Sequence, residues 1–249
     1  MRNPITLIVA TTPIKPSPQG ETLLGIGKNG TLPWPRIKSD MNFFARVSTR
    51  LPTGTETTGA GALNAIVMGR KTYYSLPKSL RPLKDRLNVV ITRDTVGGVR
   101  EEIEGDLERQ REKDAEKERG GRTRRGAVVA NSLDDALATL ARRADVGSVF
   151  VIGGGEIYAS ALRLSAEQGA FGEKLRILMT RVKKGPESGE GGFDCDTFFP
   201  LTDDDLSNDN KWREASAAEV SQWVGEEVSS EWLEDSEVSI RVVGYERQS

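Results

Sequence analysis

One carboxylate in the sequence has the setting of an acid–base residue. Asp40 lies among Ile37, Met41 and Phe44 at helical spacing, which places it on the apolar face of a predicted short helix. A carboxylate is rarely fully buried unless it is paired. Asp40 is therefore either a partly exposed residue at the edge of the apolar stripe, or a group that meets a cationic or hydrogen-bond-donating ligand. Desolvation would raise its pKa, which suits acid–base chemistry.

Composition limits the other chemistry that this chain can perform. It has no histidine and a single cysteine, Cys195, which excludes Ser-His-Asp and Cys-His catalysis, histidine-rich zinc sites and an internal disulfide. We expect no metal site. Acid–base work falls to Asp, Glu, Lys, Tyr or water, and a bound cofactor is the favoured source of reactivity. The net charge of −2 gives no general attraction for nucleic acid or an anionic membrane.

A glycine-rich loop precedes the helix of Asp40. Gly25 to Gly30 satisfy the pattern G-x-G-x-x-G, but Thr31 to Pro35 (TLPWP) follow it. Two prolines there prevent the direct strand–turn–helix transition of a dinucleotide fingerprint. Leu32 and Trp34 are too apolar for an ordinary surface turn. The pattern therefore predicts a mobile loop that exposes its backbone beside an aromatic anchor.

Anion binding is predicted at three strand ends instead. Gly69 to Thr72 (GRKT) leave a buried strand and open a helix, although Asn64 stands where a P-loop needs its first glycine. Thr92 and Arg93 end the next strand in a similar way. Either basic strand end alone is more often plain surface, but the pair favours a phosphate ester. Gly153 to Gly155 join a strand to a helix whose free N–H groups suit a diphosphate.

These segments require an α/β sheet to bring them together. Continuous apolar, β-branched runs predict buried strands at residues 5–10, 65–68, 87–92, 127–130, 149–152 and 174–181. Alternating stretches at 212–215 and 237–245 predict antiparallel edge strands. Ser132 and Asp135 predict the N-cap and the acidic partner of a helix through Arg142. The pattern indicates a mostly parallel sheet with helices between its strands.

Three polar segments interrupt this pattern in a predicted single domain, 1–249. A charged insertion lies at about 95–126, and 18 of the 26 residues from 100 to 125 are charged, nine of each sign. Balanced charge with almost no apolar face predicts a solvated or disordered excursion, with a partner-binding segment as the alternative. Polar loops are predicted at about 11–23 and 51–62. The early apolar run is too short to span a membrane and lacks signal-peptide flanks, so we expect a cytoplasmic protein.

Taken together, the motifs resemble those of dihydrofolate reductases, most closely the fungal type. The resemblance rests on GIGKNGTLPWP, VMGRKTYYSLP, RPLKDRLNVVITR, IGGGEIY and DTFFP. It implies one domain with a mixed, mostly parallel eight-stranded sheet, flanking helices and an antiparallel C-terminal edge. It also implies NADPH-dependent reduction of 7,8-dihydrofolate to 5,6,7,8-tetrahydrofolate, in support of one-carbon metabolism and thymidylate synthesis. Antifolate-type molecules would bind the same pocket, and a monomer is expected.

The same resemblance implies roles around the substrate. Asp40 would bind the pterin 2-amino group and N3 and promote protonation at N5, with Thr180 supporting it by a hydrogen bond. Trp34 would anchor an ordered water, and Leu32 would belong to the loop that closes over nicotinamide. Arg86 would pair with the α-carboxylate of the glutamate tail, which suits a guanidinium. The other implied substrate-binding residues are Ile8, Val9, Met41, Phe44, Leu76, Leu83, Ile152 and Tyr158.

The resemblance also implies three groups of cofactor-binding residues. Nicotinamide and its ribose would be bordered by Ala10, Gly25, Ile26, Gly27, Lys28, Asn29, Gly30 and Thr31. The adenosine side would be bound by Gly69, Arg70, Lys71, Thr72, Thr92 and Arg93, whose cations favour a 2′-phosphate and hence NADPH over NADH. The diphosphate would be held by Gly153, Gly154, Gly155, Glu156, Ile157 and Tyr158, with Tyr158 near nicotinamide.

Two other functions share parts of this pattern. A pyrimidine-dione reductase of riboflavin synthesis has the same fold and would keep the triple-glycine turn, but not Asp40 after the Pro-Trp-Pro corner together with Arg86. A nucleotide-binding regulator without catalysis would keep the phosphate turns and lose Asp40 or Thr180. All three residues are present here, which favours the dihydrofolate reductase hypothesis.

Overall fold

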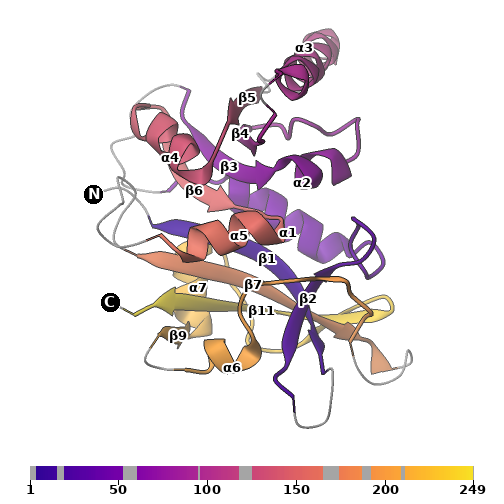
Figure 1. Ribbon diagram of the computed structural model, residues 1–249. Helices are drawn as coiled ribbons and strands as arrows, with labels where there is room; N and C mark the ends of the chain where they lie inside the picture. The colour runs from indigo at the N-terminus through magenta and orange to yellow at the C-terminus, as the bar shows by residue number, and fades with distance from the viewer. Residues whose placement is uncertain are drawn as a thin grey trace.

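A mixed β-sheet forms the centre of the protein and has helices on both faces (Figure 1). The structure is a computed structural model that describes residues 4–15, 20–52, 61–94, 96–117, 125–164, 174–186, 192–208 and 211–248. The main path of the sheet has eight strands, in the order β10 (Leu233–Asp235), β11 (Val238–Arg247), β7 (Leu175–Lys184), β1 (Ile5–Ile14), β6 (Val146–Val151), β3 (Leu63–Gly69), β4 (Arg86–Ile91) and β5 (Arg125–Ala130).

The sheet is parallel from β7 to β5 and antiparallel at its C-terminal edge. β1 pairs in parallel with both β6 and β7, whereas β11 runs antiparallel to β7 and β10. Three short antiparallel strands extend this path, β2 (Leu23–Gly27) on β1, β8 (Thr197–Phe198) on β2 and β9 (Trp212–Ala215) on β11. The predicted eight-stranded, mostly parallel sheet is confirmed, and each strand expected from the sequence overlaps an observed one.

Helices bury apolar side chains against both faces of the sheet. On one face, α4 (Leu133–Ala141), α5 (Gly155–Leu162) and α6 (Asp203–Leu206) pack against residues such as Leu7 and Val67. On the other, α1 (Lys38–Thr49), α2 (Arg70–Ser75) and α7 (Ala217–Val224) pack around Ile66 and Met68. In Figure 1, α5 lies in front of the sheet and α1 behind it. Among the helices of the described ranges, none has the length and apolar character needed to cross a membrane.

The predicted cap of α4 is present with one change. Ser132 Oγ accepts a hydrogen bond from the backbone N–H of Asp135 at 3.1 Å, as an N-cap should. The Asp135 carboxylate accepts from the N–H of Asn131 at 2.9 Å, one residue before the expected partner. The sequence signal therefore located the start of this helix correctly.

Part of the polar loop predicted at 11–23 is strand. β1 continues through Ile14, and Thr12, Pro13 and Ile14 pair with Gly25, Leu24 and Leu23 of β2. The loop prediction was wrong for Thr12, Pro13 and Ile14. Their antiparallel partner, β2, follows the proline-rich segment in the chain, so the local sequence does not show that Thr12 is buried. Residues 16–19 of this loop, and 53–60 of the loop predicted at 51–62, lie outside the described residues.

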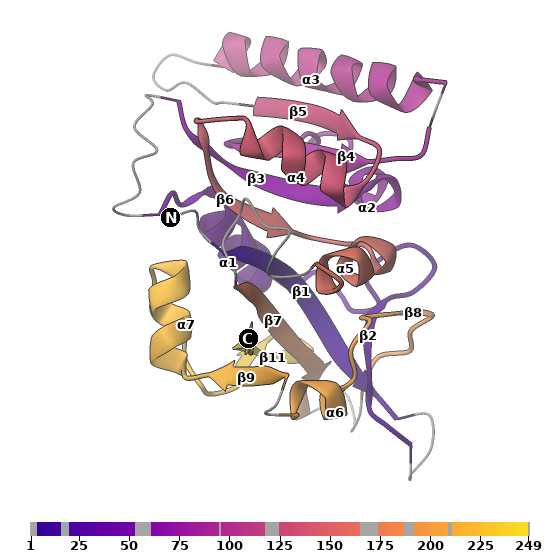
Figure 2. The same ribbon diagram turned by 60° about the vertical axis from the view of Figure 1, so that its left-hand side comes forward.

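The described part of the charged insertion contains a packed helix, which corrects the expectation of a solvated excursion there, whereas residues 95 and 118–124 lie outside the described residues. Helix α3 (Gly98–Lys117) lies along β5 (Figure 2). Val99, Ile103 and Leu107 recur at helical spacing and are buried. Asp106 and Gln110 are buried on the same helix, so the face that packs contains polar as well as apolar side chains. Those two polar positions conceal the stripe from a periodicity analysis.

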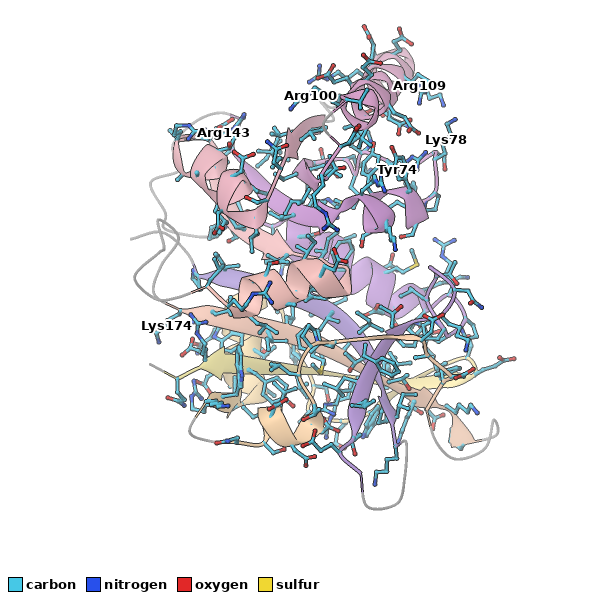
Figure 3. All side chains as sticks on the ribbon, in the orientation of Figure 1. Tyr74, Lys78, Arg100, Arg109, Arg143 and Lys174 are labelled. Atoms are coloured by element: carbon cyan, nitrogen blue, oxygen red, sulfur yellow. The ribbon has the colours of Figure 1, made fainter. Side chains whose placement is uncertain are left out.

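Hydrogen bonds satisfy these buried polar groups of α3. The Tyr73 hydroxyl donates to Asp106 Oδ2 at 3.1 Å, and Arg81 Nε lies 3.1 Å from the same oxygen. Gln110 Nε2 donates to the carbonyl of Ser79 at 3.1 Å. The Tyr74 hydroxyl donates to Glu102 of α3 at 2.7 Å. Figure 3 labels Tyr74 and, on α3, Arg109. α3 therefore holds α2 and the segment that follows it.

Replacing Ile103 by alanine tests whether α3 is part of the folded core. Ile103 is 1% exposed, so the change should lower the free energy of unfolding by about 2–5 kcal/mol through lost burial and a cavity. Glu104→Ala, at an exposed position of the same helix, should change it by less than about 0.5 kcal/mol. Equilibrium urea unfolding measures both. Equal, small changes would show that α3 does not contribute to the core.

Candidate active site

A hydrogen bond joins Asp40 of α1 to Thr180 of β7. The Thr180 hydroxyl donates to Oδ1 of Asp40 at 2.6 Å. Thr180 is buried in the middle of three paired strands, opposite Ala10 of β1 and Val242 of β11. Asp40 lies in the first turn of α1. The predicted pair is therefore brought together although 140 positions separate the two residues in the chain.

Burial is the main electrostatic influence on Asp40. It raises the pKa of the Asp40 carboxyl, while the bond from Thr180 favours the ionised form and lowers the pKa in part. Within the described ranges, the bond from Thr180 is the one side-chain hydrogen bond to this carboxylate. Asp40 thus has the properties of an acid–base residue that can also accept hydrogen bonds from a bound molecule.

Apolar side chains from several elements gather on the α1 side of the sheet. Ile8, Phe44, Leu76, Leu83 and Ile152 belong to one cluster, as expected for the walls of one pocket. Two predicted members differ. Met41 is 38% exposed and its sulfur accepts from Arg36 Nε at 3.2 Å, while the Val9 side chain packs in the core on the opposite face.

Tyr158 also points into the opposite core. Its hydroxyl donates to the carbonyl of Ile8 at 2.6 Å, and its ring meets Phe199 edge to face at 5.2 Å. The phenol is thereby committed to the backbone of β1. Tyr158 therefore supports β1 from the face opposite the predicted substrate wall.

Gly25 to Gly27 of the predicted mobile loop belong to strand β2, which corrects that part of the prediction, and Lys28 to Thr31 form a tight turn held by the segment around β8. Lys28 and Thr31 exchange backbone hydrogen bonds of 2.9 and 3.0 Å, with Asn29 and Gly30 both at positive φ. This is a two-residue hairpin turn of the Asn-Gly kind. Lys28 Nζ pairs with Asp194 at 2.7 Å, and the N–H of Asn29 donates to Asp196 at 2.8 Å.

Asp194 and Asp196 are not among the predicted site residues, although the DTFFP motif, which begins at Asp196, marks this segment. Trp34 at the end of the loop is buried and meets Phe193 edge to face at 6.1 Å. Leu32, by contrast, is 57% exposed. The loop therefore has a fixed base and an apolar residue at its surface.

Arg86 is the first residue of β4, and its side chain contacts α1. Its Nη1 donates to Ser48 Oγ at 2.7 Å, its Nε donates to the carbonyl of Lys84 at 3.0 Å, and its guanidinium lies 5.5 Å from the centroid of the Phe44 ring. These contacts give the guanidinium a fixed orientation beside the apolar cluster. The sequence carried no signal for Ser48, because its role depends on the packing of α1 on β4.

The three predicted phosphate-binding segments meet at the carboxyl ends of β3, β4 and β6. The N–H of Gly69 donates to the carbonyl of Gly153 at 2.7 Å, and Gly69 is in register with Ile91, the residue before Thr92. A Cβ on Gly154 would lie 3.4 Å from Thr72 Oγ1. The backbones of the two glycine turns and the helix-opening threonine are therefore neighbours.

Cationic residues follow Gly69 and Thr92 in the chain. Arg70, Lys71 and Arg93 are exposed, and Arg93 lies 3.3 Å from Glu156 of α5. Gly153 has φ +105°, and a Cβ there would lie 2.9 Å from the Tyr158 ring, so this position requires glycine. Exposed cations beside free N–H groups at the start of α5 can bind a phosphorylated ligand. A dinucleotide phosphate therefore fits these residues.

Comparison with known proteins assigns the family. Residues 21–121 match the family model described as Dihydrofolate reductase. The dihydrofolate reductase of Rattus norvegicus is 32% identical over 183 residues, which cover 72% of this chain and 74% of that protein. The chain belongs to the dihydrofolate reductase family. This confirms the resemblance drawn from the motifs and makes the protein an oxidoreductase.

Fungal members of the dihydrofolate reductase family match a larger share of the chain. The dihydrofolate reductase of Pneumocystis carinii is 32% identical over 230 residues, 90% of this chain and 87% of the relative. That of Schizosaccharomyces pombe is 34% identical over 236 residues, 89% of this chain but 41% of the longer relative. The expected likeness to fungal dihydrofolate reductases is confirmed.

Replacing Asp40 by asparagine should change how stability depends on pH. Because the pKa of Asp40 is raised on folding, its contribution is full below the unfolded pKa of about 3.9 and is lost as pH rises through the folded pKa. Asparagine has no such loss. The stability of Asp40→Asn relative to the original protein should therefore increase between about pH 4 and about pH 7.5 in urea unfolding without ligands. A difference that shrinks as pH rises would contradict the raised pKa.

Proposed function

We propose that this protein catalyses the NADPH-dependent reduction of 7,8-dihydrofolate to 5,6,7,8-tetrahydrofolate, in support of one-carbon metabolism and thymidylate synthesis. The observation that carries the proposal is the half-buried Asp40 carboxylate, which accepts a hydrogen bond from Thr180 at 2.6 Å beside an apolar cluster. A regulator without catalysis would have no use for this pair. A pyrimidine-dione reductase would lack the combination of Asp40 with Arg86.

Asp40 acts on the pterin in two ways. Its carboxylate accepts hydrogen bonds from the pterin 2-amino group and N3, which orients the ring, while the Thr180 bond holds Oδ1 in place. Its raised pKa brings its titration closer to neutral pH, so that Asp40 can promote protonation at N5 through water. Trp34, buried against Phe193, anchors that water near the carboxylate, and Leu32 closes over nicotinamide.

The rest of the substrate is held by apolar walls and one guanidinium. Ile8, Phe44, Leu76, Leu83 and Ile152 line the space for the pterin and aminobenzoyl groups, and antifolate-type molecules bind there too. Val9 and Tyr158 shape this wall through the β1 backbone. Met41 borders the entrance. Arg86, fixed by Ser48, pairs with the α-carboxylate of the glutamate tail in the bidentate geometry that guanidinium favours.

NADPH is the cofactor that these residues suit. The glycine turn at Gly153–Gly155 and residues 156–158 hold the diphosphate, while Gly69, Arg70, Lys71, Thr72, Thr92 and Arg93 take the adenosine side and its 2′-phosphate. Ala10 and residues 25–31 border the nicotinamide riboside. When bound, NADPH supplies the hydride that goes to C6 of dihydrofolate. We also propose that the chain acts as a cytoplasmic monomer with one domain over residues 1–249.

The direct test is the loss of NADPH absorbance on adding dihydrofolate. The purified protein should consume both, and methotrexate should stop the reaction. Replacing NADPH by NADH should slow it, because the cations at Arg70 and Arg93 would lack their phosphate. NADPH consumption that does not depend on dihydrofolate would contradict the proposal.

Asp40→Asn should fold, bind NADPH and lose most turnover at neutral pH. We expect kcat to fall by about 10²-fold or more, since asparagine keeps the size but cannot exchange a proton. Asp40→Glu is the matched variant and should keep part of the activity. NADPH binding, followed by fluorescence, should be the same in both. Near-normal steady-state turnover of Asp40→Asn would exclude the assigned role.

Arg86→Leu should weaken binding of the substrate and leave binding of the cofactor intact. Leucine preserves apolar contact with Phe44 but removes the charge, so the KM for dihydrofolate should rise about tenfold or more. The KM for NADPH should change by less than about twofold. Arg93→Leu is the matched control and should show the opposite order. If Arg86→Leu raised the KM for NADPH more, the tail-binding role would be refuted.

A further inference from the structure

The helix that carries Asp40 has no cap of its own. Its N-cap residue, Ile37, has an apolar side chain, and the first backbone hydrogen bond of α1 runs from Met41 N to Ile37 O at 3.1 Å. The N–H of Ser39 therefore has no acceptor within the helix. Ile37 is instead buried with Trp34 and Val182 in an apolar cluster, so the residue that could have capped the helix serves to pack it.

Asp235, the last residue of β10, supplies the missing acceptor. Its Oδ2 accepts hydrogen bonds from Ser39 N at 3.0 Å and from Ser39 Oγ at 2.5 Å. These bonds also keep the pKa of Asp235 below its usual value, so the carboxylate is charged at neutral pH. A negative charge at the start of a helix is favourable because the free N–H groups there are partly positive. Ser39 is the residue immediately before Asp40.

The β10–β11 hairpin that presents Asp235 is itself fixed to β7. Asp235 pairs with Val238 across a two-residue turn, and the N–H of Gly185, just after β7, donates to Glu237 in that turn at 2.8 Å. Trp232, before β10, has Lys183 Nζ at 4.2 Å and Arg241 Cζ at 5.2 Å from its ring centroid. Since β7 also carries Thr180, one strand anchors both contacts that reach the first turn of α1.

We propose that Asp235 is a positioning residue for Asp40. By binding both donors of Ser39, it fixes the first turn of α1 and keeps the Asp40 carboxylate between Thr180 and the substrate. The inference rests on the proposed role of Asp40 in binding and protonating the pterin. Displacement of a catalytic group by about 1 Å can cost up to about 10²-fold in rate, so a remote cap can have a catalytic effect.

Asp235→Ala should lower kcat/KM for dihydrofolate by about tenfold and change the Kd for NADPH by less than about twofold. Asp235→Asn should recover most of the loss, because its amide oxygen still accepts from Ser39. Ser132→Ala removes the cap of α4 and is the matched control. It should lower the thermal midpoint of unfolding by about as much as Asp235→Ala does, but should leave kcat/KM unchanged. Equal kinetic losses in Asp235→Ala and Ser132→Ala, or no rescue by Asp235→Asn, would overturn the proposal.

A binding cycle separates this inference from the proposed function. The Kd for dihydrofolate is measured by fluorescence without NADPH, so that no turnover occurs, for the original protein, Asp40→Asn, Asp235→Ala and the double variant. If Asp235 acts through Asp40, adding Asp235→Ala to Asp40→Asn should weaken binding by less than about twofold, and additive losses would overturn the proposal.

Other outcomes separate the two hypotheses. If Asp40→Asn itself kept normal kinetics, the function assigned to Asp40 would fail. If Asp40→Asn were inactive and Asp235→Ala normal, only the role of Asp235 would fail. Should Asp235→Ala not fold, Ser39→Ala removes one of the two bonds and should lower kcat/KM about threefold. Unchanged kcat/KM in Ser39→Ala would then count against the proposal.

Discussion

The hydrogen bond from Thr180 to Asp40 constrains how α1 packs on the sheet. A half-buried carboxylate beside apolar side chains is stabilised by a donor, and this donor is 140 positions away in the chain. The bond forms only if α1 lies across the end of β7, which in turn requires the apolar packing of Trp34 and Ile37 against Val182. Desolvation and this one bond act in opposite directions on the pKa of Asp40 and leave it raised. The chemistry of the site therefore depends on how closely α1 packs on the sheet.

β1 joins the two halves of the site. It pairs with β7, which carries Thr180, and with β6, which leads into the triple-glycine turn. In the parallel half, the strands end at one edge, so Gly69, Thr92 and Gly153 become neighbours through register alone. In the antiparallel half, the C-terminal hairpin returns Asp235 to the start of α1. The carboxylate and the proposed anion-binding turns are thus placed by different parts of the same sheet.

Helix α3 shows why charge content is a poor guide to burial. Two of the five buried positions in its described part would be missed by counting apolar residues, because Asp106 and Gln110 pack beside Ile103 and Leu107. A buried carboxylate is acceptable when donors surround it, and Asp106 has Tyr73 and Arg81. Tyr73 belongs to the helix that opens with the proposed cofactor-binding cations. Helix α3 therefore supports, through Tyr73, the helix that carries these cations.

The sequence by itself indicated most of the strands, the family, and Asp40, Arg86 and the glycine turns as candidate site residues, since these depend on local pattern and motif context. It could not determine which distant groups complete them. Ser48, Asp194 and Asp235 became visible only in the fold, because a hydrogen bond between remote segments leaves no periodic signal in either one. The same reason explains the misjudged residues of β1 and α3, whose burial depends on partners elsewhere in the chain. The local sequence therefore indicates which residues can do chemistry, whereas tertiary packing decides how far each one is desolvated and which groups it hydrogen-bonds.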